Sequence, residues 1–150
     1  PAVDRAIMRV DPLILVVDYE SHILHVLSRK LRNAGFEVLT ANDGEEGLGM
    51  AIQHRPDLVI TDYQMPFTTG LELCLEMKQH EETRSIPALM LTARGFSLPQ
   101  SSLEQTNILA VLSKPFSPRE VLGRVSEVLG LPEASDEPGG GGDAEYRRSA

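Results

Sequence analysis

The chain has 150 residues, of which 41% are hydrophobic and 24% are charged, and its formal net charge at pH 7 is −8. One domain with a hydrophobic core fits this length and two do not. The acidic balance argues against a nucleic-acid-binding protein with a broad basic face, and no apolar run approaches the roughly 20 residues that cross a bilayer. The single cysteine excludes an internal disulfide and a cysteine-based zinc cage. We therefore expect a cytoplasmic protein with no direct nucleic-acid partner and no membrane partner.

The two ends of the chain differ in composition from the middle. Residues 132–150 contain five acids, two arginines and a run of four glycines. Such a segment buries too little apolar surface to offset the entropy of ordering, so we predict a disordered, acidic, glycine-rich tail. Residues 1–10 are interpreted as an N-terminal lead-in, which leaves residues 11–131 as the folded domain.

Between these ends, short apolar runs alternate with segments of helical periodicity. The runs predict five strands, at residues 13–17, 36–40, 58–60, 86–91 and 108–112. Continuous apolar runs of this length are typical of strands that are buried on both faces of a parallel sheet. Five such strands separated by helices predict a doubly wound α/β fold, with helices on both faces of the sheet.

Capping residues mark the expected helices. The predicted N-caps are Ser21, Asp43, Thr69 and Ser117. The corresponding helices are expected to end at Gly35, near Arg55, near His80 and at Gly130. Residues 95–99 lack a strong helical pattern, so any helix between the last two strands is expected to be short.

Polar side chains follow four of the predicted strands where each strand ends. They are Asp18 (with Glu20 two residues later), Asp62, Thr92 and Lys114. Ligands of doubly wound sheets bind at this edge, beside the point where the strand order reverses. Two carboxylates repel each other unless a cation lies between them, and Mg²⁺ prefers such oxygen ligands. One carboxylate can attack phosphorus, while the ion and the lysine neutralise the developing charge and the threonine donates a hydrogen bond. The pattern predicts a magnesium-dependent phosphoryl-transfer site.

These residues lie in motifs that resemble those of the response regulator receiver domains of two-component signalling. The motifs are Leu15-Val16-Val17-Asp18, residues 56–66 with Met65-Pro66, Gly70, Leu91-Thr92-Ala93 and Lys114-Pro115-Phe116. The resemblance covers about residues 11–131. It implies a CheY-like, flavodoxin-like sheet of five parallel strands in the order 2-1-3-4-5.

The resemblance also implies roles for individual residues. Asp62 matches the phosphoryl acceptor, Thr92 the switch hydroxyl and Lys114 the lysine that contacts the phosphoryl group. Asp18 matches an acid of the metal pocket, and Gln64 matches the position whose backbone carbonyl binds the metal. The implied Mg²⁺ site therefore consists of Asp18, Asp62 and Gln64.

The resemblance implies that the domain signals by shifting the populations of two pre-existing conformations. A histidine kinase or a histidine phosphotransfer protein would donate the phosphoryl group to this phosphorelay receiver. Phosphorylation would draw Thr92 and Lys114 inward and bias the face formed by the fifth strand and the last two helices. Self-catalysed phosphorylation and dephosphorylation would be its only enzymatic activities, and an unknown output protein would read the signal by direct contact. Pro115 matches a proline that follows a cis peptide bond in the family.

Two positions depart from the family pattern. Tyr19 stands where the family has a second, metal-binding acid, and a phenol is a poor substitute; Glu20 is the nearest replacement. Val111 stands where many receivers have an aromatic switch residue, and its side chain is stiff. We therefore expect weakened Mg²⁺ binding and a response carried mainly by the loop of residues 94–105.

Other interpretations stay open at this point. A degenerate receiver would dock a partner without being phosphorylated, and Tyr19 and Val111 favour it. A phosphohydrolase of the haloacid dehalogenase type needs a further acidic pair, and a flavodoxin-like electron carrier needs a flavin phosphate loop; the sequence shows neither. His22 and His25 are interpreted as surface residues, and Cys74 as packed on the inner face of a helix.

Overall fold

A computed structural model describes residues 11–132 of the chain. The predicted lead-in at residues 1–10 and nearly all of the predicted tail, residues 133–150, lie outside the described residues. None of the helices within residues 11–132 is both long and apolar enough to cross a membrane.

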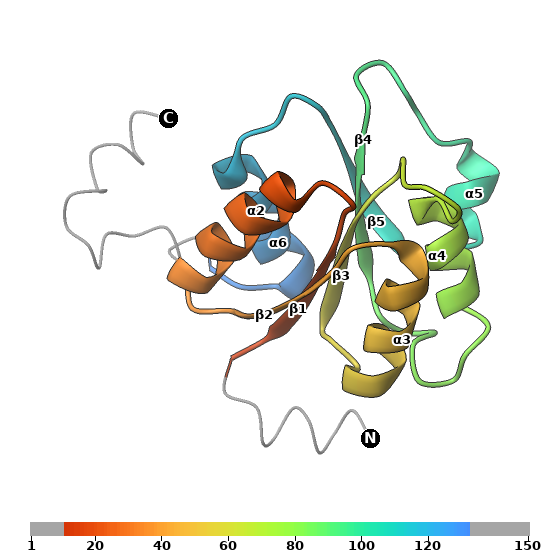
Figure 1. The fold of residues 1–150 in the computed structure, drawn as a ribbon, viewed down its shortest axis with the longest axis horizontal. Coiled ribbons are helices and arrows are strands. Elements are labelled where there is room, and N and C mark those ends of the chain that lie inside the picture. Colours follow the sequence, from red (N-terminus) through yellow and green to blue (C-terminus); the bar gives the residue numbers. More distant parts are fainter. Residues whose placement is uncertain (1–10, 133–150) are drawn as a thin grey trace.

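Five parallel strands form one sheet at the centre of the described domain (Figure 1). They are β1 (Leu13–Val17), β2 (Glu37–Ala41), β3 (Leu58–Asp62), β4 (Ala88–Thr92) and β5 (Ile108–Ser113). Their order in the sheet is β2-β1-β3-β4-β5, which confirms the predicted doubly wound fold and strand order. The order reverses between β1 and β3, so the loops that follow these two strands leave in opposite directions and open a crevice.

Helices cover both faces of the sheet (Figure 1). They are α2 (Ser21–Asn33), α3 (Gly44–His54), α4 (Gly70–Met77), α5 (Gln100–Glu104) and α6 (Pro118–Leu129). Figure 1 shows α2 and α6 on one side of the sheet and α3 and α4 on the other. The expected short helix before the last strand is α5, which has five residues and buries none of them.

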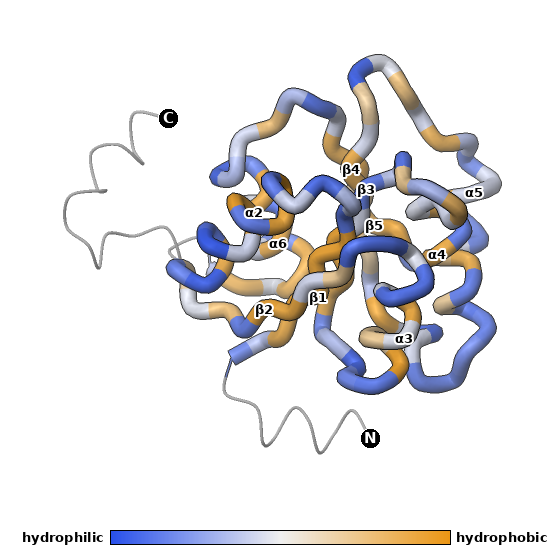
Figure 2. Tube along the Cα trace, in the orientation of Figure 1, coloured by the Kyte–Doolittle hydropathy of each residue, from blue (hydrophilic) through white to orange (hydrophobic). Residues whose placement is uncertain are grey.

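Alternate residues of β1 pack on opposite faces of the sheet, because successive side chains of a strand point in opposite directions. Ile14 and Val16 pack with residues of α2 and α6, whereas Leu15 and Val17 pack with residues of α3 and α4. Figure 2 shows mostly hydrophobic residues along the central strands, and hydrophilic residues interspersed along the helices and loops around them. All five residues of β1, β3 and β4 are buried, so the centre of the sheet is a rigid base for the loops at its edge.

One predicted cap, Ser21, is wrong, and a second, Asp43, is confirmed as a cap but without a complete capping box. Ser21 is the first residue of α2, and Glu20 occupies the cap position without a side-chain hydrogen bond to the helix. Asp43 does accept a hydrogen bond from the backbone N–H of Glu46 at 2.8 Å. The carboxylate of Glu46, however, accepts from the N–H of Asn42, so only half of a capping box forms.

The other helix signals are confirmed. Thr69 and Glu72 form a complete capping box at the start of α4. Ser117 accepts from the N–H of Glu120 at 3.1 Å, and Gly130 ends α6 in a left-handed conformation with φ 69°.

Several element boundaries differ from the predicted ones. Strand β2 lies one residue later than predicted, and β4 begins at Ala88 because Pro87 has no N–H for the ladder. Helix α4 ends at Met77 rather than near His80, and the hydroxyl of Thr83 donates to the Met77 carbonyl at 2.6 Å. That bond satisfies a carbonyl at the helix end and turns the chain toward β4.

The expectations about Cys74, His22 and His25 agree with the structure. Cys74 is buried in α4, and burial raises the pKa of its thiol to about 12. The thiol is therefore poorly ionised and unreactive. His22 and His25 are exposed on α2.

Candidate functional site

Residues from four neighbouring strand ends meet at the carboxyl edge of the sheet. Asp18 follows β1, Asp62 and Thr92 are the last residues of β3 and β4, and Lys114 follows β5. Asp18, Asp62 and Thr92 are buried. The N–H of Lys114 donates to the carbonyl of Thr92 at 2.8 Å, which fixes the start of the last loop against β4. The structure thus brings together the four side chains that the sequence placed at this edge.

A lysine ammonium joins two of the acids. The Nζ atom of Lys114 lies 3.2 Å from Oδ1 of Asp62 and 3.7 Å from Oε1 of Glu20. The side chain of Asp62 is only 4% exposed, whereas that of Lys114 is 32% exposed. Lys114 therefore reaches from the solvent edge to a carboxylate that has little other contact with solvent. The peptide bond after it, Lys114–Pro115, is cis, as the family resemblance implied.

Burial dominates the electrostatics of this site. It raises the pKa of Asp62 above its ordinary value, even though the charge and hydrogen bond of Lys114 lower it. It also raises the pKa of Asp18 to about 6, against the opposing effect of the Glu20 N–H, and the charge of Asp62 adds to the rise. Burial alone would lower the pKa of Lys114, but the charges of Asp62, Asp18 and Glu20 outweigh it and leave that pKa raised. The site therefore holds more buried negative charge than one lysine neutralises.

Asp18 provides the clearest test of whether the site suits a cation. Its Oδ1 atom accepts a hydrogen bond from the N–H of Glu20 at 2.9 Å. Its Oδ2 atom is buried and has no hydrogen-bond partner. A buried carboxylate oxygen without a partner is costly, and a hard divalent cation satisfies it. The donor set of buried carboxylates fits Mg²⁺.

The rest of the predicted metal shell is sparse. Within residues 11–132, no group of three or more His, Cys, Asp or Glu side chains is arranged to hold a metal ion. Gln64 lies in the loop after β3 with an exposed side chain, so only its backbone carbonyl is suited to the predicted role. Tyr19 is 52% exposed and brings no charge to the site. Such a site relies on few protein ligands and on the waters that Mg²⁺ keeps.

Thr92 is held on the β5 side of the site. Its side chain is fully buried, and its hydroxyl donates to the carbonyl of Leu112 at 3.4 Å. This is a long, weak hydrogen bond. The hydroxyl can therefore be released toward Asp62 at small cost when a stronger acceptor is present there.

A glycine sets the position of Asp62. A Cβ atom on Gly70, the first residue of α4, would lie 2.3 Å from the carbonyl oxygen of Asp62 and 2.9 Å from the sulfur of Met90. The N–H of Gly70 also donates to the carbonyl of Tyr63 at 2.8 Å. Only glycine permits this approach, so α4 begins directly against the backbone of Asp62.

Two aromatic features of the site were not predicted. The rings of Tyr63 and Phe96 lie 4.6 Å apart and are tilted by 35°, which links the residue after Asp62 to the loop after Thr92. Phe67 is fully exposed and has a positive φ of 70°. No periodicity marks these loop residues, because their contacts depend on how two distant loops fold.

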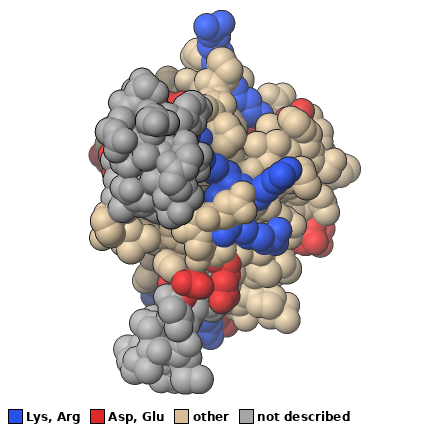
Figure 3. Space-filling view, turned by 90° about the vertical axis from the view of Figure 1, so that its left-hand side faces the viewer, with Lys and Arg blue, Asp and Glu red and all other residues tan. Residues whose placement is uncertain are grey.

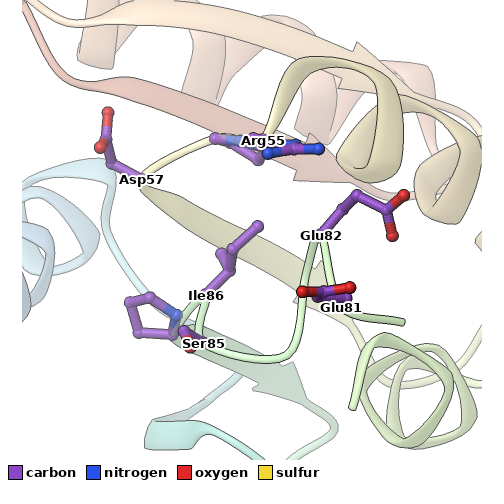
Figure 4. Close-up of a pocket in the computed structure, with 8 residues that line it drawn as sticks. Arg55, Asp57, Glu81, Glu82, Ser85 and Ile86 are labelled. Atoms are coloured by element: carbon purple, nitrogen blue, oxygen red, sulfur yellow. The ribbon is translucent and has the colours of Figure 1, made fainter. Parts of the chain in front are cut away.

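A separate pocket lies at the opposite edge of the sheet (Figure 4). Its volume is about 300 Å³, and its lining includes Arg55, Asp57, Glu82 and Ile86. These residues precede β3 and β4, so they belong to the amino ends of the strands. The pocket contains none of the predicted site residues.

Comparison with known proteins agrees with this geometry. The family model of the response regulator receiver domain matches residues 14–126. The alkaline phosphatase synthesis transcriptional regulatory protein PhoP of Bacillus subtilis is 39% identical over 116 residues, which are 77% of this chain and 48% of PhoP.

Two solved structures are also similar. Chemotaxis protein CheY4 of Vibrio cholerae is 32% identical with a TM-score of 0.72, covering 79% of this chain and 98% of CheY4. The receiver domain of sensor histidine kinase PA1611 from Pseudomonas aeruginosa has a magnesium ion coordinated in its active-site cleft. It is 25% identical with a TM-score of 0.71, covering 80% of this chain and 98% of that domain.

The chain belongs to the response regulator receiver family, and its described part is a CheY-like receiver domain of two-component signalling. It spans about half the length of the curated relatives that it matches.

Proposed function

We propose that this receiver accepts a phosphoryl group on Asp62 from the phosphohistidine of a histidine kinase or a histidine phosphotransfer protein. The observation that carries the proposal is the buried Asp62 carboxylate in contact with Lys114, beside the unpartnered oxygen of Asp18. A carboxylate oxygen of Asp62 would attack phosphorus, an aspartyl phosphate would form, and the bond from phosphorus to the histidine nitrogen would break.

The proposed roles of the other residues follow from their places. Lys114 neutralises charge on the transferring group, and Thr92 exchanges its weak bond to Leu112 for one to a phosphoryl oxygen. Asp18, Asp62 and the carbonyl of Gln64 would hold Mg²⁺. When bound, the ion would supply charge neutralisation for the phosphoryl oxygens.

The surface beside the site suggests the chemistry of the donor protein. Helix α2 contains no acid, and its basic or ionisable residues are His22, His25, Arg29, Lys30 and Arg32. A shallow depression of about 570 Å³ lies against it, lined in part by His22, His25 and Arg32. Figure 3 views the side of the molecule that carries α2 and α6, and Lys and Arg side chains gather near its centre. We propose that the donor presents an acidic surface to α2, in the cytoplasm.

Phosphoryl uptake tests the proposed function. The full chain, incubated with acetyl phosphate and Mg²⁺, should gain one phosphoryl group by intact mass spectrometry, and Asp62→Asn should gain none. A matched variant, Asp43→Asn, changes a cap residue of α3 outside the proposed acceptor machinery and should gain as much as the native chain. If the native chain gains nothing while it stays folded, the degenerate docking module is the correct interpretation.

The output is proposed to run through the loop after Thr92. Tyr63 and Phe96 connect this loop to the residue after Asp62, whereas Val111 on β5 is a stiff, half-buried side chain. We propose that the output is received by a separate partner protein or by an effector joined to the receiver. An attached effector is considered because PhoP is named as a transcriptional regulator and this chain covers only 48% of it.

Amide hydrogen exchange with a beryllofluoride phosphate mimic tests this route. We expect protection to change in residues 94–105 and to change little in residues 110–113. Phe96→Ala should reduce the change in the loop, because it removes the ring contact with Tyr63. Strong changes in residues 110–113 beside an unchanged loop would contradict the proposed route.

A further inference from the structure

Helix capping does not explain the position of the Glu20 side chain. It is the N-cap residue of α2, yet its carboxylate accepts no hydrogen bond from the helix. An acid at this end of a helix is ordinarily stabilised by the free N–H groups and by the helix dipole. The carboxylate of Glu20 instead points to the site and lies 3.7 Å from Nζ of Lys114.

The backbone of Glu20 belongs to the same site. Its N–H donates to Oδ1 of Asp18, and this bond orients the carboxyl group so that Oδ2 is left buried without a partner. One residue therefore aims Asp18 and also places a second carboxylate at the mouth of the site. Asp62, which also contacts the Lys114 ammonium, is the third acid of this group.

Tyr19, the residue before Glu20, provides no charge to the cation site. Tyr19 is half-exposed and contributes a neutral phenol at the position where the family resemblance implies a second acid. Glu20 is one position further along the chain, but its side chain is one methylene longer than that of aspartate. Its side chain is 50% exposed, so it is free to turn from Lys114 toward a cation between Asp18 and Asp62.

We propose that Glu20 supplies the third carboxylate of the cation site, in place of the acid that is missing at Tyr19. The inference rests on the proposed function, because it concerns the same Mg²⁺ site. It assigns Glu20 a metal-binding role rather than a helix-capping role.

Isothermal titration of the full chain with Mg²⁺ alone tests the assignment. Glu20→Gln should weaken binding about tenfold or more, as loss of a metal-site residue typically does. Glu20→Asp keeps the charge but shortens the reach, and it should weaken binding nearly as much. Glu82→Gln removes an equal charge from an exposed glutamate at the opposite edge of the sheet (Figure 4) and should leave the affinity unchanged.

Two further variants distinguish direct metal binding by Glu20 from an indirect effect through Lys114. Tyr19→Asp combined with Glu20→Gln should restore the affinity that Glu20→Gln loses, because an acid returns to the site. In a Lys114→Met background, Glu20→Gln should still weaken binding; no further loss there would show that Glu20 acts only by holding Lys114. Native affinity in Glu20→Gln or in Glu20→Asp would overturn the inference while leaving the proposed function intact. A native chain that binds no Mg²⁺ would overturn both.

Discussion

Gly70→Ala is expected to destabilise the domain by about 2–3 kcal/mol, the upper part of the range of about 1–3 kcal/mol that is typical when an extra group is forced into a packed site. The added Cβ would lie 2.3 Å from the backbone oxygen of Asp62, and backbone cannot move aside as a flexible side chain can. Relief requires α4 and the end of β3 to separate. The same movement displaces Asp62 from Lys114, so phosphoryl uptake should fall together with stability.

Gly49→Ala is the matched control for this prediction. Gly49 lies inside α3, and a Cβ there meets nothing within 4 Å. Alanine is the better helix former, so this variant should be more stable than the native chain by about 1 kcal/mol. Urea unfolding measures the free energy of unfolding of both variants. Equal stabilities for the two would contradict the packing of Gly70 against Asp62.

Asp18→Asn is expected to stabilise the domain at pH 7.5 when Mg²⁺ is absent. The pKa of Asp18 rises from 3.8 to about 6 in the folded chain, because the carboxyl group is buried and lies near Asp62. The folded state therefore holds the proton more tightly than the unfolded state, and stability falls as the pH rises from about 4 through about 6. A shift of this size corresponds to about 3 kcal/mol, most of which the neutral asparagine should recover.

The difference in unfolding free energy between Asp18→Asn and the native chain isolates this effect from other titrating groups. It should be large at pH 7.5 and small near pH 4. Glu76→Gln, an exposed change of the same charge on α4, should show no such pH dependence. Millimolar Mg²⁺ should stabilise the native chain at pH 7.5 but not Asp18→Asn. A native chain that is equally stable at pH 5 and pH 7.5, with no gain from Asp18→Asn, would contradict the proposed burial of an unpaired charge.

The sequence was sufficient to predict the sheet and the residues at its carboxyl edge. The apolar run before Asp18 and the one before Asp62 are local signals, and parallel strands bring their carboxyl ends together wherever the chain makes right-handed crossovers. Placing Lys114 at the same edge needed only the position of the last strand. The order of strands came from the family resemblance, and the structure confirms it.

Contacts between loops could not be predicted in the same way. The stacking of Tyr63 on Phe96 joins residues from two different loops, and no spacing rule connects them. The contact of Gly70 with the Asp62 carbonyl depends on the path of the loop between them. Glu20 was an open question in the sequence, and its 3.7 Å distance to Lys114 shows that it is part of the site. The start of α2 was predicted one residue too late, because no capping pattern in the sequence marks Glu20, which occupies the cap position without a side-chain cap bond.

Chemical trapping identifies the phosphorylated residue and so tests directly whether Asp62 is the acceptor. The full chain would be phosphorylated with acetyl phosphate and Mg²⁺, reduced with borohydride and mapped by tandem mass spectrometry. Because borohydride converts an aspartyl phosphate to homoserine, homoserine is expected at position 62 and at no other aspartate. Homoserine at position 18, or a phosphoryl group that remains on a serine, threonine or histidine, would contradict the assignment of Asp62 as the acceptor.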